Sequence, residues 1–193
     1  MVKIFCINTQ TSCTFPEGTA LMDMLPSFFP EGTSSYPIIA AKVNNVCQGL
    51  KYRAFNSRQV EFLDYTSYAG RSVYCNSLCF LFCKAAQDVF PGVKVTLRRP
   101  ISKGYFCSVT KTDGTAVTHE DLEHIKLRMR EIVDADIPFR RYEVQREEAI
   151  EMFRRLGYDD KVKLLETSGD VYVNYYTLED TPDYYYEALL SST

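Results

Sequence analysis

The segment SVYCNSLCFLFCKAAQDVF at residues 72–90 limits the fold more than any other part of the sequence. Its residues are apolar on almost every side of a helix, and Pro91-Gly92 follows, a pair that ends helices. The segment is too short and too interrupted to span a membrane. The sequence therefore predicts a buried helix that ends near Phe90.

The first 65 residues combine short strands with one early helix. Apolar runs bounded by turn residues predict strands at 2–8, 11–16, 38–45, 46–53 and 59–65. Between the second and third of these, ALMDML predicts a helix. Asn44-Asn45 suits the positive φ of a tight turn between strands. We expect residues 1–65 to form a ubiquitin-like β-grasp domain.

Residues 66–193 alternate between the two periodicities. Strands are predicted at 94–101, 104–110, 141–144 and 170–177, and further helices at 118–133, 146–156 and 160–166. Thr118 and Asp121 have the spacing of a capping box at the start of the helix at 118–133. Gly157 ends the helix at 146–156. The fold class expected for the whole chain is therefore α+β, with a β-grasp domain at 1–65 and a larger α+β domain at 66–193.

Charge and motifs exclude several classes of function. The net charge is -3 with a pI near 5.5, whereas proteins that attract nucleic acid without sequence preference usually carry a basic surface. The amino-terminal segment resembles no signal peptide, so we expect a cytoplasmic protein without a membrane partner. Neither a G-x-x-x-x-G-K-[ST] loop nor a G-x-G-x-x-G turn occurs, so these residues have no recognisable ATP site.

Cysteine and histidine are the residues that most often bind metals. The seven cysteines form no C-x-x-C pair, but Cys75, Cys79 and Cys83 recur every four residues and share one helical face. A site for a soft metal and a role as small apolar core residues both fit, and we favour the core role. His119 and His124 are five residues apart and point away from a common ligand, so we expect solvated surface histidines.

The order of segments resembles a known family. FPEGTALMDML at 15–25 and AAKVNN at 40–45 resemble the TGS domain that opens threonyl-tRNA synthetases. Four later segments are similar, in order and spacing, to motifs of the editing domain that follows it in that family. They are VFPGVKVTLRRPISKGYF, THEDLEHIKLRMREIV, PFRRYEVQREEAIEMFRRLG and KVKLLE. The resemblance covers nearly the whole chain and implies the same tandem fold.

The resemblance also implies where an editing site would lie. The family uses H-x-x-x-H on the long helix and a later cysteine and histidine, which can bind zinc and activate hydrolysis. These four positions correspond here to Asn76, Phe80, Tyr185 and Leu189. Phenylalanine and leucine cannot bind a metal, and an asparagine and a tyrosine leave no three-ligand site. We therefore expect no catalytic residue and no metal or other cofactor in these residues.

A ligand pocket without catalysis is the remaining expectation for this region. The candidate ligand-binding residues are Asn76, Arg98, Arg99, Lys103, Tyr105, Lys161, Asp183 and Tyr185. Arginine and lysine at positions that are small or acidic in the family favour a nucleotide, an anion or RNA as ligand. The alternative, which we rate slightly higher for Arg98 and Arg99, is a solvated edge with paired carboxylates nearby.

Aromatic and basic runs have competing interpretations too. Tyrosines at 172, 175, 176 and 184–186 could stack on bases, but alternation along a strand favours core packing. The pairs Arg140-Arg141 and Arg154-Arg155 could contact phosphate. Glutamates at 143, 147 and 148 make surface ion pairs the simpler expectation.

The segment VNYYTLEDTPDYYYEALLSST at 173–193 resembles the leader region of bacterial uridine kinase-like nucleoside kinases. That resemblance implies a fragment whose partner is a kinase domain beyond Thr193, with ATP and Mg²⁺ used there and not here. Our first hypothesis is therefore a non-catalytic regulatory or ligand-binding region of such a kinase. A trans-acting or degenerate threonyl-tRNA editing module is the second, and a structural or partner-binding domain pair is the third.

Overall fold

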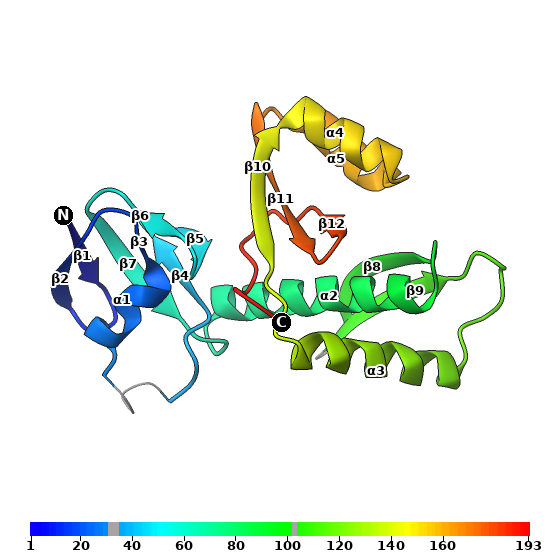
Figure 1. Ribbon diagram of the computed structural model, residues 1–193, viewed down its shortest axis with the longest axis horizontal. Coiled ribbons are helices and arrows are strands. Elements are labelled where there is room, and N and C mark those ends of the chain that lie inside the picture. The colour runs from blue at the N-terminus through cyan, green and yellow to red at the C-terminus, as the bar shows by residue number, and fades with distance from the viewer. Residues whose placement is uncertain (31–34, 102–103) are drawn as a thin grey trace.

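The computed structural model describes residues 1–30, 35–101 and 104–193, with Arg99 and Pro100 described by their backbone alone (Figure 1). Helices and strands occur both in residues 1–65 and in the rest of the chain, which confirms the expected α+β fold class. Among the described residues, no helix has the length and apolar character needed to cross a bilayer.

The amino-terminal third of the chain is a β-grasp. A five-stranded sheet has the order β2-β1-β7-β4-β5, in which β1 and β7 run parallel and the other neighbours antiparallel. Its strands are β1 (Val2–Cys6), β2 (Thr11–Phe15), β4 (Ala40–Val43), β5 (Val46–Gly49) and β7 (Arg58–Leu63). Asn44 and Asn45 join β4 to β5 with φ of 47° and 67°, which confirms the predicted tight turn.

One helix completes the β-grasp core. α1 (Leu21–Phe28) buries Leu21, Met24 and Phe28 against apolar side chains of the sheet. Phe28 contacts Phe15 and Phe62, with ring centroids 5.9 and 6.0 Å away. The short strands β3 (Thr19–Ala20) and β6 (Arg53–Ala54) pair with each other beside this core.

The predicted buried helix is α2 (Tyr68–Val89), the long helix at the centre of Figure 1. It packs against α3 (His119–Asp134) and the hairpin of β8 (Lys94–Ile101) and β9 (Gly104–Thr110). Burial is not complete, however. Tyr74 and Leu78 remain 47% and 44% exposed, because the neighbouring elements leave one side of the helix uncovered. The expectation of an all-round buried helix was wrong for this side.

The rest of the second half is a three-stranded sheet of order β10-β11-β12 with two helices. Its elements are β10 (Arg140–Gln145), α4 (Arg146–Arg155), α5 (Asp159–Thr167), β11 (Tyr172–Leu178) and β12 (Thr181–Asp183). Alternate residues of β11 enter different cores: Val173 and Tyr175 pack with α4 and α5, whereas Tyr176 and Leu178 join the core around α2. The predicted core packing is confirmed for Tyr175 and Tyr176, while Tyr172 and Tyr186 are exposed.

The β-grasp and the rest of the chain are in contact. β7 ends at Leu63 and α2 begins at Tyr68, so the expected boundary between residues 65 and 66 falls in the turn that joins them. The segment 187–193 contacts both the β-grasp and the long helix: Ala188 packs with Ala40 and Leu63 of the β-grasp and with Val73 of α2. The Lys51 ammonium also donates to the carbonyl of residue 191 at 2.8 Å.

Candidate functional site

Three of the four positions that the resemblance aligns with metal ligands, Phe80, Tyr185 and Leu189, pack together in one apolar core. The rings of Phe80 and Tyr185 lie 5.5 Å apart, and Leu189 belongs to the same apolar cluster. Phe80 is completely buried and Leu189 is 2% exposed. Asn76 lies one turn before Phe80 on α2 and is partly exposed. Carbon side chains therefore fill the space between α2 and the carboxy-terminal segment.

A zinc ion does not fit this donor set. Zinc sites need three or four nitrogen, sulfur or carboxylate ligands around one point. In the part of the chain that the structure describes, no three histidine, cysteine, aspartate or glutamate side chains are grouped so that they could hold a metal ion. Metal-assisted activation of water is therefore not available at Phe80 and Tyr185.

An ion pair borders this core. Lys161 of α5 lies 2.8 Å from a carboxylate oxygen of Asp183 at the end of β12, and the two side chains are 25% and 13% exposed. The Lys161 ammonium also lies 5.9 Å from the centre of the Tyr185 ring, within the range of a cation–π contact. Three of the predicted ligand-binding residues are thus brought together from two distant parts of the sequence.

Raised pKa values keep both Lys161 and Tyr185 protonated at neutral pH. Burial alone would lower the pKa of Lys161, but the adjacent Asp183 carboxylate raises it above the ordinary lysine value. Burial raises the pKa of the Tyr185 phenol well above its usual range, and Asp183 adds to that effect. An ammonium and a phenol that both keep their protons can donate hydrogen bonds, but they cannot accept a proton from water.

The cysteines of α2 lie beside the same core. Burial, followed by the thiols of Cys75 and Cys107, raises the pKa of Cys79 to about 11. Burial, followed by the Asp183 carboxylate, raises the pKa of Cys83 to about 12. Cys107 of β9 contributes to both shifts, so it lies near them. Nucleophilic attack requires a thiolate, and these thiols are protonated at neutral pH. Their surroundings fit the expected role as small apolar core residues.

The outcome differs among the other predicted ligand-binding residues. Tyr105 of β9 is 48% exposed and lies beside Cys75 and Cys79, which contribute after burial to raising the pKa of its phenol. Arg98 is exposed, as a solvated edge predicts, but no carboxylate of the described residues pairs with it. The Arg99 side chain and Lys103 lie outside the described residues. The structure therefore does not place the proposed basic side of the pocket.

The two histidines are surface residues, and the consecutive arginines form the expected surface ion pairs only in part. His119 is 87% exposed at the start of α3, and His124 is exposed as well. Arg154 forms a surface ion pair, but with Glu166 at 3.0 Å and not with the glutamates near it in sequence. Arg141 pairs with no carboxylate of the described residues. It donates to Asn174 and Gln48, both at 3.0 Å, because β11 and β5 present amides there.

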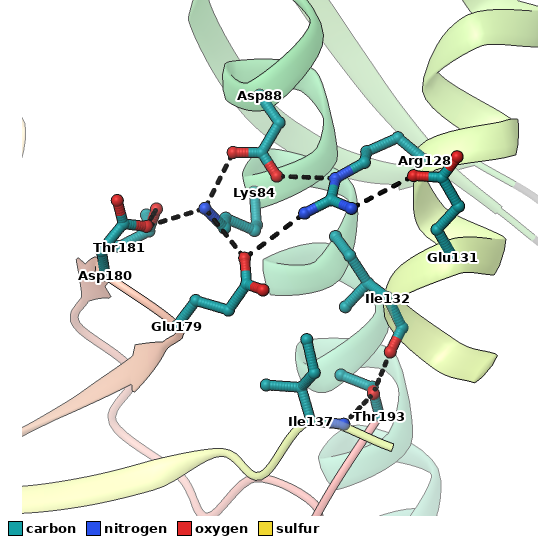
Figure 2. Close-up of polar contacts among 10 residues, drawn as sticks. All are labelled: Lys84, Asp88, Arg128, Glu131, Ile132, Ile137, Glu179, Asp180, Thr181 and Thr193. Atoms are coloured by element: carbon teal, nitrogen blue, oxygen red, sulfur yellow. Dashed lines mark hydrogen bonds and ion pairs between the residues drawn. The ribbon is translucent and has the colours of Figure 1, made fainter. Parts of the chain in front are cut away.

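Sequence reasoning missed a charge network around Lys84 (Figure 2). The Lys84 side chain is 5% exposed and its ammonium lies 2.8 Å from Asp88, 2.8 Å from Asp180 and 3.2 Å from Glu179. Arg128 of α3 continues the network to Asp88 and Glu179, at 2.9 and 3.4 Å. Burial alone would lower the pKa of Lys84, but hydrogen bonds to these carboxylates raise it.

The network holds the turn between β11 and β12 on α2 and α3. Glu179, with φ of 53°, and Asp180 form that turn, and Asp183 and Tyr185 follow shortly after it. The only sequence signal was the spacing of Lys84 and Asp88, which are four residues apart within an apolar helix. Figure 2 also shows that the Thr193 hydroxyl donates to the carbonyl of Ile132 and accepts from the amide of Ile137.

A β-grasp domain followed by an α+β domain built around one long helix is the tandem that the resemblance implies. No protein-family profile matches the chain. The curated relatives indicate a region related to aminoacyl-tRNA synthetases, and those relatives are threonine–tRNA ligases.

The similarity covers most of this chain and a small part of each relative. The ligase of Symbiobacterium thermophilum is 29% identical over 88% of this chain, and that of Pelodictyon phaeoclathratiforme is 32% identical over 79%. The ligase of Desulforamulus reducens is 30% identical over 75%. The chain spans about a quarter of their lengths, 26%, 23% and 23%. The kinase interpretation gains no support from these relatives.

Proposed function

We propose that this chain is a degenerate threonyl-tRNA editing module that binds an aminoacylated RNA end without hydrolysing it. The observation that carries the proposal is the contact of Phe80 with Tyr185 at the place where the family has metal ligands. Similarity to threonine–tRNA ligases over most of the chain supports the relationship. According to this proposal, the chain is related to the editing domain but does not catalyse its hydrolytic reaction.

Loss of hydrolysis follows from the chemistry of the remaining groups. Cleaving an ester requires a water molecule activated by a metal or a base, and stabilisation of the charge that develops on the carbonyl oxygen. Lys161, Tyr185 and Cys83 all retain their protons at neutral pH because their pKa values are raised. These groups cannot take a proton from water, and the carboxylate of Asp183 is engaged by the Lys161 ammonium at 2.8 Å.

Retained recognition is supported by the polar groups at the edge of the core. Lys161 and Asp183 are held in fixed positions by their ion pair, and the exposed phenol of Tyr105 lies on the neighbouring hairpin. A fixed pair of opposite charges suits an aminoacyl group, whose ammonium and carbonyl need an acceptor and a donor. The acidic net charge makes weak overall affinity for RNA the expectation.

A direct test compares turnover with binding. Threonine tRNA charged with serine, which lacks one methyl group of threonine, is incubated with the purified chain, and a threonine–tRNA ligase that retains H-x-x-x-H serves as the positive control. We expect the rate of ester loss to equal that of buffer alone. Turnover that is abolished by Lys161→Ala would contradict the proposal.

Binding is measured with an adenosine that carries serine through a 3′ amide, which cannot be hydrolysed. We expect saturable binding that Lys161→Ala weakens at least tenfold. Lys163→Ala is the matched control, since Lys163 lies on the same helix and is exposed. Absence of binding by the unaltered chain, or equal losses in both variants, would show that no recognition site remains.

A further inference from the structure

The β-grasp domain contains a groove that the proposed function does not use. It has a volume of about 480 Å³ and lies between the end of α1 and the end of β7. Residues that line it include Asn8, Phe29, Ile38, Glu61, Asp64 and Thr66. Phe80 lies more than three turns further along α2 than the last groove residue, Ser67, which corresponds to roughly 20 Å. The groove is therefore separate from the candidate editing site.

One wall of the groove is aromatic and apolar. Phe29 contacts Phe62 edge to face, with ring centroids 5.6 Å apart and an interplanar angle of 89°. Ile38 lies beside them, and Tyr36 contacts Tyr65 with centroids 5.0 Å apart. An apolar ligand of modest size can contact these rings, since ligand sites commonly have volumes of about 300 Å³ and above.

The charges that line the groove are all negative. Glu61 and Asp64 are its ionisable carboxylates, and no lysine or arginine is among its described lining residues. Hydrogen bonds from the Thr66 hydroxyl and amide to Asp64 Oδ1, at 2.6 and 2.9 Å, lower the pKa of Asp64. Asp64 is therefore ionised at neutral pH. Its other oxygen, Oδ2, accepts no hydrogen bond from any described residue.

Two other polar side chains of the groove, Asn8 and Glu61, are already paired. The Asn8 side chain bonds to both the amide and the carbonyl of Phe62, at 2.8 and 3.0 Å, and Glu61 pairs with Lys42 at 3.2 Å. Asp64 is thus the groove carboxylate that has no cationic partner among the described residues, whereas Lys42 already neutralises Glu61. A nucleotide or another anion would face repulsion from both carboxylates.

We propose that this groove binds a small organic ammonium ion with an aromatic or apolar body. The ammonium would lie against Asp64, and the body would pack on Phe29 and Ile38. Aromatic faces attract cations as well as apolar groups, so both walls favour the same ligand class. The proposal is independent of the proposed editing ancestry, because no residue of the Phe80 core takes part.

The groove also adjoins the start of α2. The Ser67 hydroxyl donates to the carbonyl of Asp64 at 2.9 Å and accepts from the amide of Gly70 at 3.1 Å, which caps the helix. A ligand held by Asp64 would therefore rest on the turn from which α2 begins. We expect occupancy to stabilise that turn, because a ligand that binds the folded state raises its stability.

Calorimetric titration and amide NMR with phenethylammonium chloride test the proposal. We expect saturable binding with a dissociation constant of about 1 mM or below and shift changes at Phe29, Asp64 and Thr66. With the unaltered chain, 2-phenylethanol and phenylacetate should bind at least tenfold more weakly, since neither is a cation. Equal affinity for these three compounds would contradict the charge argument.

Variants test the position of the ammonium. Asp64→Asn should weaken phenethylammonium binding at least tenfold, and it keeps the Oδ1 acceptor for Thr66 so that the turn can form. Glu151→Gln, an exposed change on α4, should have no effect. Binding that persists in Asp64→Asn, shift changes confined to other parts of the molecule, or no binding by the unaltered chain would overturn the proposal.

Discussion

Gly70 shows how one residue determines the junction between the two domains. A Cβ atom at this position would lie 1.9 Å from the carbonyl oxygen of Asp64, so the turn from β7 into α2 has no room for a side chain. We predict that Gly70→Ala lowers the free energy of unfolding by about 2 kcal/mol or more, as measured by urea denaturation. Gly169→Ala, where a Cβ atom would meet nothing within 4 Å, should change it little.

Lys84 is a second residue with a large expected effect. Replacing it by methionine removes the cation shared by Asp88, Glu179 and Asp180 and leaves their carboxylates close together. We predict a loss of about 3 kcal/mol in the free energy of unfolding. Lys126→Met is the control, because Lys126 is 57% exposed and surface ion pairs contribute little. Similar losses in the two variants would show that the network is not stabilising.

At the scale of elements, the start of α3 should respond to acid. Thr118 and Asp121 form the predicted capping box, and the Lys111 ammonium also bonds to Asp121. Lys111, followed by the Thr118 amide, lowers the pKa of Asp121 to about 2 from an ordinary value of 3.8. A lowered pKa means that the stabilisation is complete above pH 3.8 and is lost as pH falls towards 2.

Hydrogen exchange measured across that interval should show the amides at the start of α3 losing protection as the carboxylate is protonated. Asp121→Asn cannot titrate, so its first-turn protection should be lower at neutral pH and nearly constant between pH 4 and 2. An unchanged acid response in Asp121→Asn would assign the effect to another group.

Most elements were predictable because their signals are local. Alternation, capping residues and turn residues indicated the strands of the β-grasp, the α3 cap and the Asn44-Asn45 turn. The predicted all-round burial of α2 failed at Tyr74 and Leu78, since composition does not say how many sides neighbours cover. Tyrosine alternation in β11 succeeded because a strand has only two faces.

The candidate site was less predictable, because its contacts join distant residues. Lys84 and Asp180 are 96 residues apart, and no periodicity links them. The meeting of Phe80 with Tyr185 followed only from the resemblance to threonyl-tRNA synthetases. The resemblance supplied the side chains of the site, and residue patterns alone predicted neither these side chains nor their pairing.

For the whole molecule, the contact between the domains predicts joint unfolding. Ala188 is 5% exposed and packs with Ala40 and Leu63 of the β-grasp and Val73 of α2. We predict one calorimetric transition for the unaltered chain and two for Ala188→Glu, because a buried carboxylate would separate the domains. Tyr186→Glu changes a side chain that is 92% exposed and should keep one transition. Two transitions in the unaltered chain would show that the domains unfold independently.

The position of residues 184–193 in the chain has a consequence for synthesis on the ribosome. The β-grasp has all its strands once Leu63 has emerged, so it can fold early, as amino-terminal domains generally do. Phe80 must wait for Tyr185 and Leu189, which are translated more than a hundred residues later. During that interval the apolar side of α2 lacks part of its native cover, so slow elongation prolongs the exposure of a surface that favours aggregation.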